Sequence, residues 1–202
     1  MSLEISDYRI KFPSNLFPTN LRDTIWSKIK ELEWENRHRV LEDDGYQGNI
    51  HWGRAELDPW SSYHYRELFT SNLSDTLGTP IAAQECILSL QKIKHKEPFG
   101  IHFDRDIASI QCVIHGDRHS PVKFYEEDPR QTYWFNKWGN FPVAKQEVTY
   151  NDDVFYLNTT KWHDNKYITE DRYLIRFIFN ERMEQKVRYN YEWFRKRLNE
   201  IL

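Results

Sequence analysis

The pattern of apolar and polar residues changes from helical spacing to strand spacing along the chain. Near the start, apolar residues recur three or four positions apart: Leu21, Ile25, Ile29 and Leu32. This spacing predicts an amphipathic helix that Thr19 or Asn20 would cap. A second helix is predicted over about 62–77, ending at Gly78. Between the helices, 37–60 carries turn signals without a clear period, so we expect irregular structure there.

From Pro80 onward the pattern of apolar residues indicates short β-strands. The predicted strands are 85–93, 100–104, 108–114, 122–125, 146–150, 154–157 and 173–179. A last helix is predicted from Asn180, with this apolar stripe: Met183, Val187, Tyr191, Phe194, Leu198 and Ile201. Helices first and strands after predict an α+β domain with helices packed on one face of a β-sandwich. The long connection at 126–142 is expected to be either a lid over the substrate or a loop that only packs against the domain.

Composition limits the classes of function. The 202 residues are enough for one domain with a substantial core, and the 16% of aromatic residues can fill a sandwich interior. The formal net charge of -3 argues against nucleic acid or anionic membranes as partners. No apolar run has membrane-spanning length and no signal pattern is present, so we expect a cytoplasmic protein. Cys86 and Cys112 are expected to be reduced and buried.

Candidate chemistry lies in a predicted strand and in a segment sixty-one residues later. His102 and Asp104 are two positions apart, so in an extended strand both point to the same face. His163 follows another apolar strand. Two histidines and one carboxylate form the facial ligand set that holds ferrous iron and leaves coordination positions open. The alternative is that His102 and Asp104 are surface residues of a polar turn.

Two arginines occupy the last predicted strand. Arg172 and Arg176 are four residues apart and therefore share a face that is otherwise apolar. If that face is buried, both guanidinium groups need anionic partners. A carboxylate on a neighbouring strand would be one partner. A carboxylate of a bound ligand, gripped by two parallel hydrogen bonds, would be the other.

The ordered series of His102, Asp104, His163 and Arg172 resembles the iron(II)/2-oxoglutarate-dependent dioxygenase superfamily. The segment 163–172 and the strand after it are most similar to the aspartyl/asparaginyl β-hydroxylase-like branch, and the resemblance covers 81–180. It implies a double-stranded β-helix, a cupin-like jelly roll. It also implies that His102, Asp104 and His163 are the catalytic iron ligands and that Arg172 binds the distal carboxylate of 2-oxoglutarate.

The spacing of the arginine departs from this family. Arg172 follows His163 by nine residues, whereas ten or eleven is more usual in the family, and a shift of one residue reverses the face of a strand. A different turn or a β-bulge could absorb the difference. Otherwise Arg176, which faces the same way, could bind 2-oxoglutarate instead.

The resemblance also implies an organisation and a reaction. A single dioxygenase domain over 1–202 would comprise a helical layer at 1–79, a jelly-roll core at 80–180 and a C-terminal helix at 181–202. With Fe(II), O2 and 2-oxoglutarate as co-substrate, it would hydroxylate an unactivated C–H bond and convert 2-oxoglutarate to succinate. The expected substrate is an amino acid, an amino-acid-like small molecule or a peptidyl side chain. A metal-binding jelly roll without catalysis is the alternative, as is an interaction domain in which the three ligands never meet.

A second pair of histidines competes for a metal role. His115 and His119 are four residues apart, a spacing that would suit two ligands on a helix. Gly116 and Pro121 favour a loop at this point instead. We therefore expect these histidines to lie in a connection between strands and not to form a metal site.

Overall fold

The computed structural model describes residues 3–43, 46–95, 102, 108–126, 143–165, 168–179 and 189–202. Its α-helices in these ranges are α1 (Thr19–Ile29), α2 (Pro59–Leu77) and α4 (Tyr191–Ile201). Two short 3-10 helices are η1 (Ser14–Leu16) and η2 (Ala83–Glu85). No helix of the described part is long and apolar enough to cross a membrane.

A large sheet and a small sheet form the β structure. The large sheet has eight strands, in the spatial order β1 (Glu4–Ile5), β2 (Arg9–Phe12), β9 (Val154–Leu157), β6 (Ala108–Gly116), β11 (Arg172–Phe179), β5 (Cys86–Ile93), β4 (Tyr46–Ala55) and β3 (Glu35–Asp43). The small sheet has the order β10 (His163–Asp164), β7 (Val122–Phe124) and β8 (Gln146–Val148). Every pairing between these strands is antiparallel.

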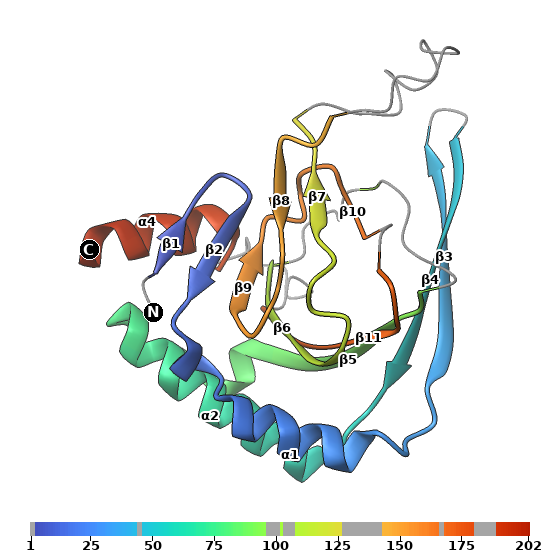
Figure 1. Ribbon diagram of the computed structural model, residues 1–202. Coiled ribbons are helices and arrows are strands. Elements are labelled where there is room, and N and C mark those ends of the chain that lie inside the picture. The colour runs from blue at the N-terminus through green and yellow to red at the C-terminus, as the bar shows by residue number, and fades with distance from the viewer. Residues whose placement is uncertain are drawn as a thin grey trace.

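The chain moves back and forth between the two sheets (Figure 1). After β5 in the large sheet, His102 forms a bridge to β10 in the small sheet, and the chain then returns to β6. Next, β7 and β8 lie in the small sheet, β9 in the large sheet, β10 in the small sheet and β11 in the large sheet. This alternation is a double-stranded β-helix, which confirms the predicted jelly roll with packing helices.

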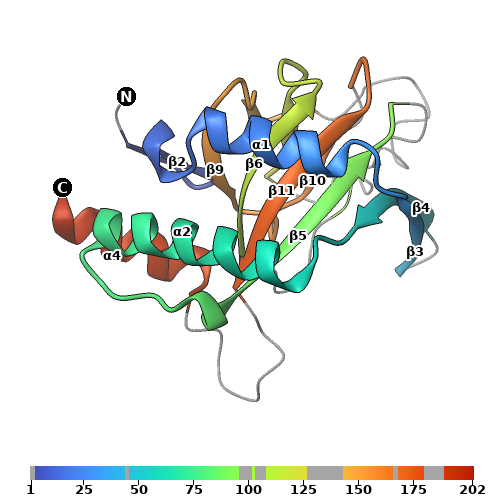
Figure 2. The ribbon, with the colours of Figure 1, turned by 90° about the horizontal axis from the view of Figure 1, so that it is seen from below.

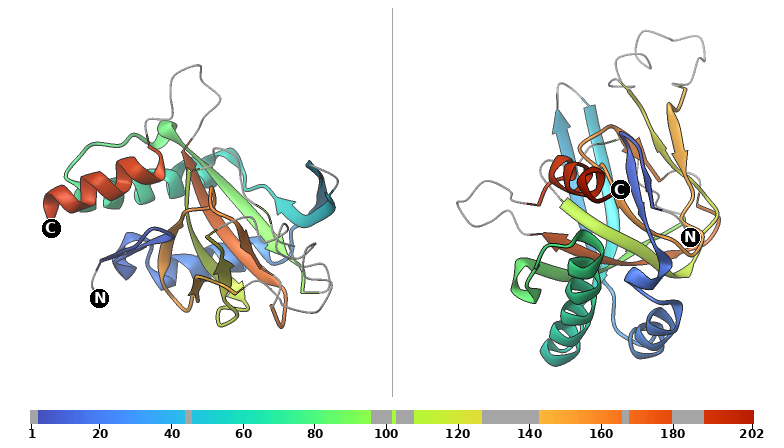
Figure 3. Two further views of the ribbon diagram at one scale, coloured as in Figure 1. Left: turned by 90° about the horizontal axis from the view of Figure 1, so that it is seen from above. Right: turned by 90° about the vertical axis from the view of Figure 1, so that its left-hand side faces the viewer.

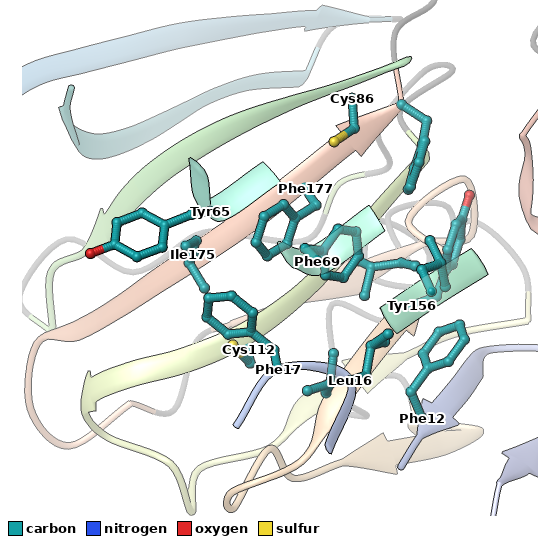
Figure 4. Packing of buried hydrophobic residues seen from close by; sticks show 14 of the residues in the cluster. Phe12, Leu16, Phe17, Tyr65, Phe69, Cys86, Cys112, Tyr156, Ile175 and Phe177 are labelled. Carbon is teal, nitrogen blue, oxygen red and sulfur yellow. The ribbon is translucent and has the colours of Figure 1, made fainter. Parts of the chain in front are cut away.

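The outer face of the large sheet carries the main hydrophobic core. Figure 2 shows α1 and α2 lying across this face. The ring of Phe69 from α2 stacks on Phe177 of β11, with centroids 3.7 Å apart and planes 6° apart. Phe17 meets the same Phe177 ring edge-on at 5.2 Å (Figure 4). These aromatic contacts fix the helices against the sheet.

The inner face of the large sheet looks toward the small sheet. A second buried cluster fills the space between the sheets: Ile93, Val113, Val122, Phe124, Val148, Tyr150, Phe155, Leu157, Ile168 and Leu174. Leu174 of β11 belongs to this cluster, whereas its neighbour Ile175 belongs to the core under the helices. Because side chains alternate along a strand, Arg172 and Arg176 face the jelly-roll interior together with Leu174.

The structure confirms the predicted positions of α1 and α2. It does not confirm every predicted capping residue. The helix α2 begins at Pro59, where Asp58 accepts a hydrogen bond from the Ser61 N–H at 2.9 Å. It ends before Gly78, whose φ of 57° is the left-handed conformation that glycine adopts most readily. The predicted polar cap of α1 is wrong, because Pro18 precedes that helix without a side-chain hydrogen bond.

The prediction of irregular structure over 37–60 is wrong. The strands β3 and β4 pair along their whole length as a hairpin. Within the described residues, this hairpin joins the rest of the large sheet where Gly53–Ala55 pairs with β5. It lies at the opposite side of the molecule from α4 (Figure 3). The first 79 residues therefore contribute four strands as well as helices.

Three predicted segments fall wholly or partly outside the described residues. Of the strand at 100–104, the structure describes His102 alone. The connection at 126–142 is described only at Glu126, and the start of the last helix at 180–188 is not described. A helix is confirmed over α4, where Asn190 accepts a hydrogen bond from the Trp193 N–H at 2.8 Å. The prediction of one continuous helix from Asn180 is wrong at 189–190, because Asn190 is an N-cap in an extended conformation.

Candidate metal centre

His102 and His163 lie side by side although sixty-one residues separate them. Their backbones form an antiparallel bridge, in which the His102 N–H donates to the His163 carbonyl at 2.9 Å and the reverse bond measures 2.8 Å. Their ring centroids are 4.3 Å apart. Both side chains are buried, at 4% and 3% exposure. The fold thus brings together two of the three ligands predicted from the sequence.

The pair faces the jelly-roll interior. His163 is directly opposite Phe124 in the pairing of β10 with β7, and directly opposite residues of an antiparallel pair share one face. Phe124 belongs to the buried cluster between the sheets, and its ring centroid lies 5.7 Å from that of His163. The two imidazoles therefore project from the small sheet into the space between the sheets.

A backbone carbonyl orients the ring of His163. Nδ1 of His163 lies 2.9 Å from the Lys161 carbonyl oxygen. When Nδ1 carries the proton and donates it to this carbonyl, Nε2 carries the lone pair that binds a metal. Metal-ligating histidines are held in this way, because the second hydrogen bond fixes both the tautomer and the ring plane.

Asp104, the third predicted ligand, lies outside the described residues. Within the described ranges, no group of three His, Cys, Asp or Glu residues lies close enough together to hold a metal ion. The triad of His102, Asp104 and His163 therefore stays a prediction, of which the structure shows the histidine pair.

A buried carboxylate beside His163 was not anticipated from the sequence. The Tyr125 hydroxyl donates to Oδ2 of Asp164 at 2.8 Å, and both residues are almost fully buried. The Tyr125 N–H also donates to the Trp162 carbonyl at 2.9 Å. These bonds tie the end of β7 to β10 on both sides of His163. The pairing of two strands distant in sequence created this contact, so no local pattern could have predicted it.

All three guanidinium nitrogens of Arg172 form hydrogen bonds at one end of the barrel. Its Nε donates to the Asp117 carbonyl at 2.7 Å, and Nη2 donates to the Ser120 carbonyl at 2.6 Å. Nη1 donates to Oδ1 of Asn165 at 3.1 Å, and the side chain is fully buried. We call Arg172, Asp117, Ser120 and Asn165 the Arg172 cluster. It ties the turn after β6 to the connection between β10 and β11.

Asp117 supplies the negative charge of the Arg172 cluster. Its Oδ1 lies 3.7 Å from Nη2 of Arg172. It also accepts hydrogen bonds from the backbone N–H groups of His119, Ser120 and Thr169. Burial raises the pKa of the Asp117 carboxyl, but these hydrogen bonds and the charge of Arg172 outweigh burial and hold that pKa well below its usual range.

Arg176 has different surroundings. Its Nη1 donates to Oε1 of Gln91 at 3.3 Å, and Nη2 donates to the Ser109 hydroxyl at 3.1 Å. Its Nε is buried without a hydrogen-bond partner. Tyr150 lies within electrostatic reach of both arginines: burial raises the pKa of its hydroxyl to about 12, and the two positive charges partly oppose this rise.

The second pair of histidines lies at the end of β6 and in the turn that follows it. His115 is exposed at the end of β6 and stacks on Trp26, with ring centroids 3.9 Å apart and planes 10° apart. His119 lies in the following turn, with Nδ1 at 3.2 Å from Oδ1 of Asn151. The two rings have separate partners. The expectation that both histidines lie in a connection between strands is wrong for His115, which lies within β6.

Comparisons with known proteins show the fold but not a family. No protein-family model matches the sequence, and no curated protein is similar to it in sequence. The structure resembles that of HygX from Streptomyces hygroscopicus with nickel and 2-oxoglutarate bound, with a TM-score of 0.54 and 13% identity over 87% of this chain and 83% of HygX. HygX with nickel, 2-oxoglutarate and hygromycin B bound gives a TM-score of 0.51 and 12% identity over the same shares. An oxidoreductase of the 2OG-Fe(II) oxygenase family from Burkholderia pseudomallei gives 0.49 and 13% identity, over 84% of each chain.

At these identities the likeness to HygX establishes a shared fold, in agreement with the strand topology. Membership of the aspartyl/asparaginyl β-hydroxylase-like branch stays a prediction from the sequence. The same holds for the identity of the metal and of the substrate.

Proposed function

We propose that this protein is an iron(II)/2-oxoglutarate-dependent dioxygenase that hydroxylates an unactivated C–H bond. The observation that carries the proposal is the backbone bridge between His102 and His163, which sets two distant imidazoles side by side in a jelly-roll interior. The shared fold with HygX, a protein seen with nickel and 2-oxoglutarate bound, supports the same conclusion.

The donor set fits a divalent transition metal. Two imidazoles and one carboxylate suit ferrous iron and leave positions open for further ligands. His102 and His163 would hold the ion with Asp104, which follows His102 by two residues. When bound, iron and 2-oxoglutarate supply the oxidising chemistry, in which O2 is consumed and 2-oxoglutarate yields succinate and carbon dioxide.

The chain itself contributes orientation and a dry interior. The Lys161 carbonyl holds the ring of His163, and the bridge to His102 holds the two backbones in register. Phe124, Phe155 and other members of the buried cluster keep water out of the space that the histidines face. Excluding water strengthens every electrostatic interaction within the site and protects reactive species from side reactions.

For the substrate, the sequence prediction of an amino acid, an amino-acid-like small molecule or a peptidyl side chain stands as our proposal. For the distal carboxylate of 2-oxoglutarate, the sequence offers Arg172 first and Arg176 second. The two arginines have different contacts: Arg172 donates to Asp117, Ser120 and Asn165, whereas Arg176 donates to the neutral oxygens of Gln91 and Ser109.

Turnover of 2-oxoglutarate tests the proposal. The purified protein with Fe(II), ascorbate, O2 and 2-oxoglutarate should form succinate and carbon dioxide, and a screen of amino acids and peptides should detect a product that has gained one oxygen atom. His163→Ala and His102→Ala should abolish succinate formation, because each removes a metal ligand. His64→Ala on the exposed side of α2 is the matched control and should retain it.

Two results would contradict the proposal. Succinate formation that survives His163→Ala would show that the chemistry does not use this histidine pair. A wild-type protein that binds metal and 2-oxoglutarate but never forms succinate, with any substrate in the screen, would instead be the non-catalytic metal-binding jelly roll.

A further inference from the structure

The two edges of the large sheet differ in length. At one edge lies β1, which is two residues long, and at the other lies β3, which is nine residues long. Among the described residues, β3 pairs with β4 alone. An antiparallel ladder uses the backbone N–H and C=O groups of alternate residues on each side of a strand. The side of β3 that faces away from β4 therefore offers the other half of these groups to a further strand.

The strand β3 lacks several features that protect edge strands in other proteins. It contains no proline and no lysine, and its pairing with β4 runs without a bulge from Glu35 to Asp43. The hairpin of β3 and β4 stands on the side of the molecule away from α4 (Figure 1), and within the described residues it joins β5 through Gly53–Ala55. A long and regular edge strand is a template for pairing with another chain.

The charges along β3 form two blocks of opposite sign. The basic block at 37–39 consists of arginine, histidine and arginine, and the acidic block at 42–43 consists of glutamate and aspartate. Two apolar residues at 40–41 lie between the blocks. When two copies of such a strand pair in antiparallel fashion, the basic block of each copy faces the acidic block of the other. Opposite charges at directly opposed positions of an antiparallel pair are stabilising.

One register gives this match on both sides of a two-fold axis. With Val40 opposite Val40 of the second copy, Arg37 stands opposite Asp43 and His38 stands opposite Glu42. Each of these pairs occurs twice, because a two-fold interface uses the same surface of both copies. The paired stretch is 37–43 in each copy.

The neighbouring registers place like charges together. With Arg39 at the axis, two arginines stand opposite each other and Glu35 stands opposite Asp43. With His38 at the axis, Arg37 stands opposite Arg39. Axes nearer to Asp43 shorten the paired stretch. Because like charges at opposed positions are destabilising, the charges of β3 select the register centred on Val40.

We infer that β3 pairs with β3 of a second copy of this chain, antiparallel about a two-fold axis at Val40, so that the large sheets of two protomers become one continuous sheet. The inference is independent of the proposed function. In the single chain, Arg37 forms an ion pair with Glu35 at 2.7 Å, and both side chains are exposed. Exposed pairs of this kind contribute little, so Arg37 can exchange that partner for Asp43 of the second copy. The short paired stretch predicts a dissociation constant in the micromolar range.

A charge-swap experiment tests both the dimer and its register. Sedimentation velocity is recorded from about 1 µM to about 300 µM for the full-length protein and its variants. Arg37→Asp places two aspartates opposite Asp43, and Asp43→Arg places two arginines opposite Arg37. Each substitution alone should weaken self-association by at least about 10-fold. An equimolar mixture of the two variants should associate as wild type does, because each introduced charge then meets an opposite charge.

A control and a double variant complete the experiment. Arg54→Asp makes the same change of charge on β4, the inner strand of the hairpin, and should leave association unchanged. The double variant Arg37→Asp/Asp43→Arg should self-associate as wild type does. If circular dichroism shows a single variant to be unfolded, the double variant decides the register.

Three results would overturn the inference. The first is a wild-type protein that stays monomeric over the whole concentration range. The second is a folded Arg37→Asp variant that associates as strongly as wild type, which would place the contact on another surface. The third is a mixture of the two folded variants, or a folded double variant, that stays monomeric, which would exclude this register.

Discussion

The two faces of β11 differ: the outer face is apolar and packs under the helices, and the inner face carries two arginines. Its outer face presents Ile175, Phe177 and Phe179 to aromatic rings from the helices, and these side chains are almost fully buried. Its inner face presents two arginines, which no packing requirement would select. Residues that only stabilise are thus concentrated under the helices, and residues that can bind a ligand face the barrel.

The inner face is itself divided. Each guanidinium nitrogen of Arg172 forms a hydrogen bond and Asp117 lies beside it, whereas Nε of Arg176 has no hydrogen-bond partner. The same residue type therefore has a carboxylate partner at one position and only neutral partners four residues later. The difference arises from the loops near each position, because the turn after β6 reaches Arg172 with two carbonyl oxygens.

The largest expected effect is on the outer face. Phe177→Ala should lower the free energy of unfolding by about 3–5 kcal/mol, because it removes a ring that stacks on Phe69 and leaves a cavity under α2. Urea denaturation followed by circular dichroism measures the loss. Ile87→Ala, on the half-exposed inner side of β5, is the control and should cost less than about 1 kcal/mol. Equal losses at the two positions would show that stability is not concentrated on the outer face.

Breaking the Arg172 cluster should be the next most costly change. Arg172→Met should lower the free energy of unfolding by about 3 kcal/mol, because it leaves Asp117 buried without its cation and two carbonyl oxygens without donors. Urea denaturation gives the value. In the double variant with Asp117→Asn, part of the loss should be recovered, since the uncompensated charge is gone. If Arg172→Met lowers the free energy of unfolding by less than about 1 kcal/mol, this arginine has no major structural role.

A smaller, pH-dependent effect is expected beside the same end of the barrel. Burial raises the pKa of the Asp171 carboxyl, but hydrogen bonds from His95 and Lys92 outweigh it and lower that pKa to about 2. A carboxyl with a lowered folded-state pKa stabilises the protein above its unfolded pKa of about 4, and this contribution disappears as the pH falls toward about 2. Asp171→Asn should therefore cost about 1 kcal/mol at pH 7, after allowing for solvent screening.

Urea denaturation at pH 7 and at lower pH measures this contribution. The difference between wild type and Asp171→Asn should shrink steadily below pH 4 or so. Glu170→Gln, at the exposed neighbouring position, serves as the control and should show no such trend. A difference that stays constant down to the lowest pH would mean that the carboxylate does not titrate as described.

The smallest expected effect on stability is at Arg176. Unlike the other substitutions, this one should raise the free energy of unfolding slightly. Arg176→Met should change the free energy of unfolding by no more than about 1 kcal/mol and should tend to stabilise, because it removes a partly buried charge that has no counter-ion. A loss of stability as large as that of Arg172→Met would show that both arginines have a structural role.

The sequence predicted much of the fold because strand and helix periods are local. Alternation along 172–179 correctly assigned Arg172, Leu174 and Arg176 to one face. The hairpin of β3 and β4 was missed for the opposite reason. Its first strand, Glu35–Asp43, consists mostly of polar and charged residues, so its sequence shows no apolar alternation that would indicate a strand.

The sequence predicted the candidate metal ligands, but it did not predict the hydrogen bonds around them. The spacing of His102 and Asp104 and the position of His163 suggested a metal centre, and the structure shows the two histidines together. The bond between Tyr125 and Asp164 joins residues thirty-nine positions apart in neighbouring strands, and nothing in either local segment points to it. Such contacts depend on which strands pair, which a single sequence does not state.

What the sequence by itself determined is which side chains share a face, because the two-residue period of a strand follows from backbone geometry alone. Only the tertiary structure decided what each of those side chains meets. Arg172 met two carbonyls and an aspartate from a turn more than fifty residues away, whereas Arg176 met two neutral oxygens. Hydrogen bonds and desolvation act over a few ångströms in space regardless of distance along the chain, so the difference between the two arginines appears only once the chain has folded.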